Sequence, residues 1–124
     1  MTILLDQVFS ASTEALAGLR DAGWLVLGSG SLTHNLYALG HPGMPPQPWA
    51  QAFADWMAER LAAGEVEALL DWQHQAPFAR ENHPTDEHLL PLFFALGAGG
   101  GAAGQALHRG IEYAAIAMDA WRFG

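Results

Sequence analysis

A run of four apolar residues, Trp24-Leu25-Val26-Leu27, constrains the fold of this chain most strongly. Asp21-Ala22-Gly23 breaks the segment before it, and Gly28-Ser29-Gly30-Ser31 follows directly. A continuous apolar run between turn signals is typical of a β-strand that is buried on both faces and therefore needs neighbours on both sides. Either Thr2-Ile3-Leu4-Leu5 supplies a further strand or the chain is part of something larger, and we expect the second.

Helical patterns lie on both sides of this strand in the sequence. Ser10 and Ser12 occupy candidate N-cap positions of a helix that is expected to run to about Ala22. The strongest amphipathic pattern begins at Pro48, a residue that suits the first turn of a helix. Its apolar positions recur at helical spacing and are Trp49, Phe53, Trp56, Met57 and Leu61.

The second half of the chain mixes short helices, loops and a strand. The expected elements are a short helix from Gly64 to near Trp72, an irregular segment over 73–82, a helix from about Thr85, a glycine-rich loop over 97–104 and a strand from Ile111 to Phe123. Pro91 lies inside the helix from Thr85 and predicts a kink or a tight first turn. Together these patterns predict an α/β fold, a sheet flanked by helices, organised as a single domain over residues 1–124.

Composition limits the classes of partner. The 124 residues carry thirteen acidic and five basic side chains, and a net charge of −8 repels phosphate backbones and anionic lipids. We therefore expect no nucleic-acid partner and no membrane partner. Residues 89–107 carry no charge, but Pro91 and several glycines argue against a membrane span. The absence of cysteine and of a basic, signal-like N-terminus fits a cytoplasmic protein.

Two histidine motifs point to a shared site. The first runs from Gly28 to Asn35 and contains His34, and its glycines are expected to let the backbone turn sharply. The second runs from Asn82 to His88, just before an apolar segment. Because open α/β sheets bind ligands at the carboxyl ends of their strands, we expect the rings of His34 and His88 to lie within roughly 10 Å of each other there.

Three blocks of sequence carry a resemblance to a known family. They are Val26 to Leu36, Asn82 to Leu92 and Ala117 to Phe123, with Pro48-Trp49 between the first two. In order and spacing they resemble the C-terminal half of the LigB-like group of class III extradiol ring-cleavage dioxygenases. The resemblance implies the α/β fold of that half. The N-terminal half of the family members, which supplies two further metal-binding histidines, has no counterpart here.

The resemblance also implies roles for two histidines and a class of reaction. His88 matches a histidine that binds a divalent metal, iron(II) in active enzymes, with zinc possible as the bound ion. His34 matches a histidine that acts as a metal-proximal ligand or as the catalytic acid–base residue facing the substrate. The implied substrates are a catecholic small molecule and O2, which is inserted next to the diol so that the ring opens.

Other polar residues near these motifs have two interpretations each. His83 precedes a proline, where an imidazole either satisfies backbone groups or supports a metal ligand from behind. Glu87 either orients His88 or is an exposed acid near a helix start. His41, His74 and His108 lie in polar or glycine-rich surroundings and are expected to be solvated.

Three functions are compatible with these residues. The first is an extradiol dioxygenase whose site is completed by a complementary N-terminal half or by self-association with a second copy. The second is a truncated, inactive remnant that keeps the fold and a weak metal site. The third is a zinc-binding domain that performs hydrolysis, because histidine ligands also suit zinc.

Overall fold

The computed structural model describes residues 5–124, so most of the possible extra strand at Thr2–Leu5 lies outside the described residues, and Leu5 begins a helix. The helices are α1 (Leu5–Leu16), α2 (Pro48–Ala63), α3 (Val66–Leu70), α4 (Trp72–Gln75), α5 (Ala79–Asn82) and α6 (Leu90–Ala98), with 3₁₀ turns η1 (Ala17–Leu19) and η2 (Leu36–Ala38). The strands are β1 (Gly104–His108), β2 (Ile111–Glu112), β3 (Ile116–Ala117) and β4 (Ala120–Phe123).

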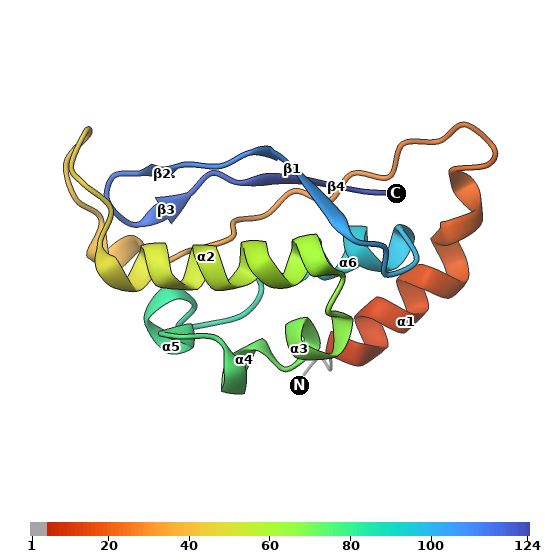
Figure 1. Cartoon of the computed structure of the whole chain (residues 1–124), viewed down its shortest axis with the longest axis horizontal. Helices are drawn as coiled ribbons and strands as arrows, with labels where there is room; N and C mark the ends of the chain where they lie inside the picture. The colour runs from red at the N-terminus through yellow and green to blue at the C-terminus, as the bar shows by residue number, and fades with distance from the viewer. Residues whose placement is uncertain (1–4) are drawn as a thin grey trace.

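Helix α2 is the axis around which the other elements are arranged. The strands run along one side of α2, and the short helices α3, α4 and α5 lie along the other (Figure 1). Helices α1 and α6 pack against each other at one end of the molecule. Among residues 5–124, no helix is both long enough and apolar enough to cross a bilayer.

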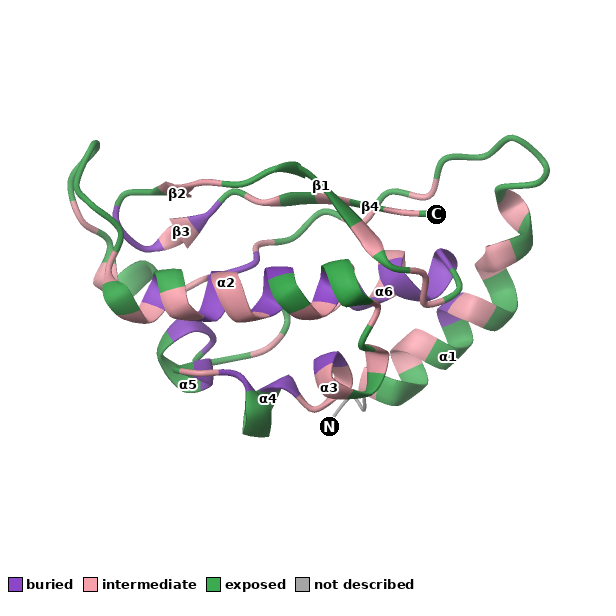
Figure 2. Ribbon diagram, viewed as in Figure 1, coloured by how far each residue is buried: buried purple, intermediate pink, exposed green. Residues whose placement is uncertain are grey.

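The amphipathic pattern from Pro48 forms α2 as predicted. Pro48 occupies the first turn, and Gly64 ends the helix in the left-handed conformation (φ 68°), where its N–H bonds the carbonyls of the last turn. Phe53, Met57 and Leu61 are fully buried and form the centre of the core with side chains from α3, α4 and α6. Figure 2 shows buried positions recurring along the length of α2.

The first helix differs from the expected one. It covers Leu5–Leu16 instead of running from about Ser10 to Ala22. Ser12 is therefore not a cap: it is buried within the helix, and its hydroxyl donates to the carbonyl of Val8 at 2.7 Å. A serine that bonds back to the preceding turn is compatible with a helix interior, which is why the capping signal misled.

The α/β class is confirmed, but the strands are shorter than predicted. They form two antiparallel pairs, β1 with β4 and β2 with β3. The expected single strand over 111–123 is broken because Tyr113 and Ala114 adopt positive φ angles of 51° and 63° and turn the chain. Residues 73–82 are not fully irregular, since α4 and α5 include most of them.

The last helix begins later than expected. It starts at Leu90 instead of near Thr85, and Pro91 lies in its first turn, which is one of the two outcomes predicted for this proline. His88 therefore lies in the turn that precedes α6. Its ring is placed by this turn and not by the regular helix.

The prediction of a doubly buried strand at Trp24–Leu27 was wrong. No regular strand forms there in the described part of the chain. Trp24, Leu25 and Leu27 are 66%, 86% and 78% exposed. A strand requires a neighbouring strand with which it forms hydrogen bonds, and within residues 5–124 this run has none.

The two glycines after this run allow a close approach and not a sharp turn. Neither Gly28 nor Gly30 has a positive φ. A Cβ atom on Gly28 would collide with the carbonyl oxygen of Pro91. One on Gly30 would collide with the carbonyl oxygen of His88 and lie 2.9 Å from Cγ of Pro91. The glycines thus let residues 28–31 lie directly against the turn that carries His88.

Replacing Gly30 by alanine tests this close approach. The added methyl group has no room, so we expect Gly30→Ala to lower the free energy of unfolding by about 1–3 kcal/mol in urea titrations. Gly18→Ala is the matched control, because nothing lies within 4 Å of a Cβ placed there. Equal unfolding free energies for the two variants would contradict the packing described.

Candidate functional site

The rings of His34 and His88 are stacked on each other. Their centroids are 3.4 Å apart and their planes differ by 20°. Both residues are partly exposed, with 42% of the His88 side chain accessible. The expected proximity is therefore present, although the strand that was expected to organise it is not. The two imidazoles therefore lie next to each other at a partly exposed place on the surface.

Backbone hydrogen bonds hold the two histidine segments together. The N–H of Ser31 donates to the carbonyl of His88 at 2.8 Å, and the N–H of His34 donates to the carbonyl of Asn82 at 2.9 Å. Each bond involves a backbone group of one of the two histidines. The rings are thus brought together by main-chain contacts that do not depend on a bound ligand.

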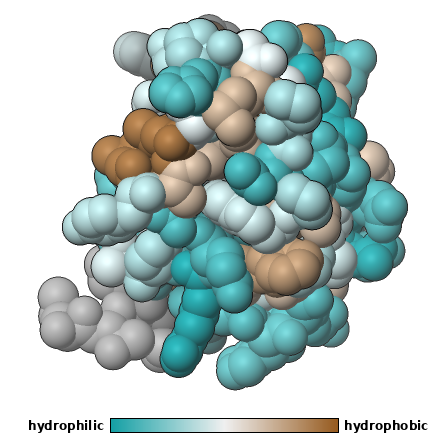
Figure 3. Space-filling model, turned by 90° about the vertical axis from the view of Figure 1, so that its left-hand side faces the viewer, coloured by the Kyte–Doolittle hydropathy of each residue, from teal (hydrophilic) through white to brown (hydrophobic). Residues whose placement is uncertain are grey.

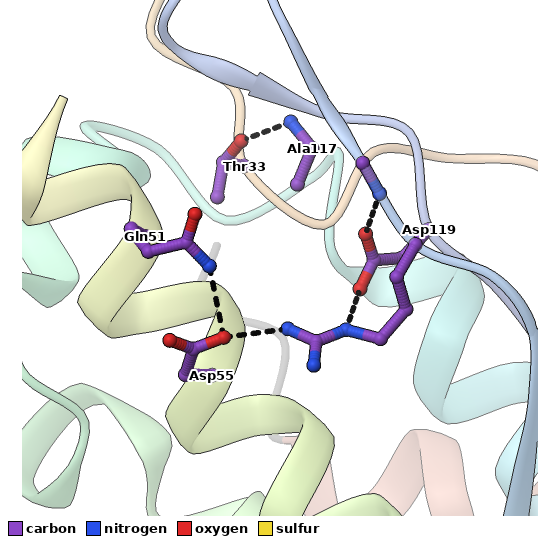
Figure 4. A network of polar contacts seen from close by, with 7 residues as sticks. Thr33, Gln51, Asp55, Ala117 and Asp119 are labelled. Atoms are coloured by element: carbon purple, nitrogen blue, oxygen red, sulfur yellow. Dashed lines mark hydrogen bonds and ion pairs between the residues drawn. The ribbon is translucent and has the colours of Figure 1, made fainter. Parts of the chain in front are cut away.

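Thr33 fixes the same segment from the opposite side. Its side chain is fully buried, and its hydroxyl donates to the carbonyl of Ala115 at 2.8 Å. The same oxygen accepts the N–H of Ala117 at 2.6 Å (Figure 4). Since a buried polar group without partners is costly, these two bonds set the position of the residue next to His34.

His83 lies behind the stacked pair and is buried. Its Nε2–H donates to the carbonyl of Leu32 at 2.7 Å, which requires the proton to be on Nε2. The ring packs against Phe53 and Trp72. Burial lowers the pKa of His83 to about 4, although the bond to Leu32 opposes this shift. Of its two interpretations, the contacts match the one in which the imidazole satisfies a backbone group.

Glu87 is exposed beside His88. Its Oε1 lies 3.8 Å from Nε2 of His88, which is an ion-pair distance and too long for a hydrogen bond. Its own backbone N–H and the hydroxyl of Thr85 lower the pKa of this carboxyl. Glu87 is therefore a charged neighbour of His88 and is not hydrogen-bonded to the ring.

A cavity of about 330 Å³ opens beside His88. It is lined by residues 27–32, by α6 and by β4. Leu89, Leu92, Trp121 and Phe123 make much of its wall apolar, and Asp119 is also among its lining residues. An apolar wall with few polar groups is typical of a small-molecule site.

One charged network near the cavity was not predicted from the sequence. Arg109 donates to Asp119 at 3.2 Å and to Asp55 of α2 at 2.7 Å (Figure 4). The bond to Asp55 is the main cause that raises the pKa of Arg109. Only 2% of the Asp119 side chain is exposed. An acid in the otherwise apolar block from Ala117 to Trp121 was the available signal for this buried carboxylate.

The described residues supply an incomplete ligand set for a metal ion. Within residues 5–124, no group of three or more histidine, cysteine, aspartate or glutamate side chains is arranged to hold an ion. His41, His74 and His108 are exposed, as predicted, and do not join the pair. The site therefore consists of two imidazoles, a neighbouring carboxylate and an apolar cavity.

Comparison with known proteins places the chain in a family. Residues 10–124 match the family model described as the catalytic LigB subunit of aromatic ring-opening dioxygenase. Proteins named 4,5-DOPA dioxygenase extradiol from Beta vulgaris and from Escherichia coli K12 are each 34% identical to it, over 89% and 88% of this chain. The chain therefore belongs to the LigB family, and the resemblance predicted from the histidine blocks is confirmed.

A solved structure agrees with this assignment. The crystal structure of an uncharacterized protein from Escherichia coli K12 superposes with a TM-score of 0.81 at 29% identity and covers 98% of this chain. The chain spans only part of its relatives, however. It covers 41% and 42% of the length of the two dioxygenases and 51% of the solved chain.

The buried imidazole of His83 predicts a pH-dependent stability. The pKa of His83 is about 4 in the folded protein and 6.5 in the unfolded chain, so between these values the unfolded state binds more protons. The stabilisation is therefore complete above about pH 6.5 and is lost as the pH falls toward 4. From pH 7 to pH 5 we expect a loss of roughly 2 kcal/mol from this residue.

Denaturant titrations of the wild type and of His83→Gln at both pH values measure this effect. Glutamine keeps an N–H donor for the Leu32 carbonyl but does not titrate, so it controls for the hydrogen bond. The wild type should lose more stability on acidification than the variant. The same loss in both proteins would show that His83 is not the group responsible.

Proposed function

We propose that His34 and His88 form part of a non-haem iron(II) site that cleaves catecholic rings in the extradiol manner. The stacked pair of imidazoles, in a chain of the ring-opening LigB family, is the observation that carries this proposal. Imidazole is a ligand that suits non-haem iron, and zinc is an alternative ion for the same donors. The relatives named as 4,5-DOPA dioxygenase extradiol support a catecholic substrate.

The residues present are of a type that binds metal ions, but they are too few to form a complete ligand set. The centroids of the two rings are 3.4 Å apart, a separation compatible with two metal–imidazole bonds of about 2.1 Å to one ion. Catalytic sites of this kind normally use three protein ligands. We therefore propose that the remaining ligands come from outside this chain segment. The inactive-remnant alternative is the outcome expected if no such ligands are supplied.

The two histidines have different proposed tasks. His88, in the turn before α6, is the metal ligand. His34 stacks on His88 and either binds the same ion or is the acid–base group that takes a proton from a catechol hydroxyl. Bound iron(II) would hold the catecholate and O2 next to each other and pass electrons from the catecholate to O2, so that both oxygen atoms enter the ring-opened product. The apolar cavity beside His88 excludes water from the aromatic ring and orients it.

Measurements of metal affinity distinguish His34 and His88 from the solvated histidines. We expect the isolated chain to bind iron(II) weakly under anaerobic conditions, and His88→Ala and His34→Ala to lower the affinity further. Mutating a residue that hydrogen-bonds to a metal ligand typically lowers the metal affinity about 10- to 100-fold. Removing a ligand itself should therefore lower the affinity by at least this factor. Isothermal titration with iron(II) or zinc measures it.

His74→Ala is the matched control, because the His74 side chain is 83% exposed and its Nδ1 is bonded to the carboxylate of Asp71. It should bind metal like the wild type. After oxygen is admitted, cleavage of a catecholic acid is detected by the yellow colour of the semialdehyde product. Equal metal affinity in all three variants would remove His34 and His88 from the proposed site.

A further inference from the structure

The segment that carries His34 is hydrogen-bonded to the short helix α5. The backbone N–H of His34 donates to the carbonyl of Asn82, the last residue of α5, at 2.9 Å. One residue further along, Nδ2 of Asn35 donates to the carbonyl of Glu81 at 2.6 Å. Two successive residues are thus bonded to two successive carbonyls of α5. The position of His34 therefore depends on how firmly α5 is held in the molecule.

Helix α5 has little apolar contact that could hold it. Of its four residues, Ala79 and Asn82 are buried, and Ala79 contributes a single methyl group. Phe78, the residue before α5, is exposed and adopts the left-handed conformation (φ 53°), which is unfavourable for a bulky side chain. The end of the molecule at which α2 begins, next to α5, is mainly hydrophilic with separate apolar spots (Figure 3). Hydrophobic burial therefore contributes little to the placement of α5.

The side chain of Asn82 connects α5 to the core helix α2. This side chain is fully buried. Its Nδ2 donates to the carbonyl of Trp49, in the first turn of α2, at 3.0 Å and to the carbonyl of Phe78 at 2.9 Å. Both partners are acceptors, so the two bonds determine which end of the amide faces them. The bond to Phe78 is local, whereas the bond to Trp49 joins α5 to the helix at the centre of the core.

We propose that Asn82 is a positioning residue for His34. Its side chain is bonded to α2, and its own carbonyl accepts the N–H of His34, so a single residue connects the histidine to the core helix. Because Asn82 is fully buried, it acts through His34 and not by contact with a ligand. The consequence for metal binding or proton transfer rests on the proposed function of His34. The consequence for the stacking of His34 on His88 does not.

Two substitutions separate the two side-chain bonds of Asn82. In Asn82→Ser the hydroxyl has a single hydrogen, which is expected to bond the carbonyl of Phe78 four residues earlier, as serine does in helices. This variant keeps the local bond and loses the bond to Trp49. Asn82→Leu keeps a side chain of similar size and removes both donors. Both variants should therefore release α5, and with it His34, from α2.

Nuclear magnetic resonance of the EDTA-treated chain measures this release without metal. In both variants we expect loss of the cross-peak between the ring protons of His34 and His88. Relative to the amides of α2, the His34 amide should exchange at least about tenfold faster than in the wild type, because its acceptor is no longer held. In a separate titration, zinc affinity should fall at least about tenfold, as for other residues that support a metal ligand.

Leu69→Ala is the matched control for a general loss of stability. It truncates a fully buried side chain of α3 and removes none of these hydrogen bonds. Despite its lower stability, the folded variant should keep the cross-peak, the relative exchange rate of His34 and the zinc affinity of the wild type. This control separates positioning of His34 from a purely structural role of Asn82.

Several results would overturn the proposal. One is a folded Asn82→Ser or Asn82→Leu protein that keeps the cross-peak and the relative exchange rate of His34. Another is Leu69→Ala losing the cross-peak as the Asn82 variants do. Failure of both Asn82 variants to fold would assign the residue to stability alone. Absence of zinc binding by the wild type would instead contradict the proposed function, since the measurements in EDTA are independent of metal.

Discussion

The hydrogen bonds that clamp residues 31–34 are the interaction on which the rest of the site depends. On one side, the backbone of this segment bonds the carbonyls of Asn82 and His88. On the other, the hydroxyl of Thr33 joins it to the chain around β3. Because these partners are far apart in sequence, the clamp also connects the first histidine motif to the C-terminal strands. The stacking of the two rings follows from this main-chain geometry.

The interior behind the clamp avoids a buried charge. His83 is held neutral by burial, with its single N–H used on the Leu32 carbonyl, so the stacked histidines have an uncharged imidazole behind them. The charged groups lie toward the surface or in pairs, as with Arg109 and its two carboxylates. The proposed function accordingly assigns metal binding to the partly exposed pair.

The sequence predicted the features that depend on local spacing. The α2 stripe at Phe53, Met57 and Leu61 became the core, and the two histidine motifs met, because periodicity and motif order are local or family-level signals. The apolar run at Trp24–Leu27 was wrongly predicted to be a buried strand. A buried strand needs neighbouring strands, and residues 5–124 contain none that pairs with this run. The role of Gly30 was wrongly predicted for a related reason. Glycine is needed there because His88 and Pro91, which lie far away in sequence, leave no room for a side chain.

The main-chain contacts of this chain bring the rings of His34 and His88 together without metal. Nuclear Overhauser effects between the ring protons of the two histidines in EDTA-treated protein test this arrangement. We expect a cross-peak in the wild type and its loss in Thr33→Val, which removes both hydrogen bonds of the Thr33 hydroxyl. No cross-peak in a folded wild-type sample would contradict the account, and so would an unchanged cross-peak in Thr33→Val.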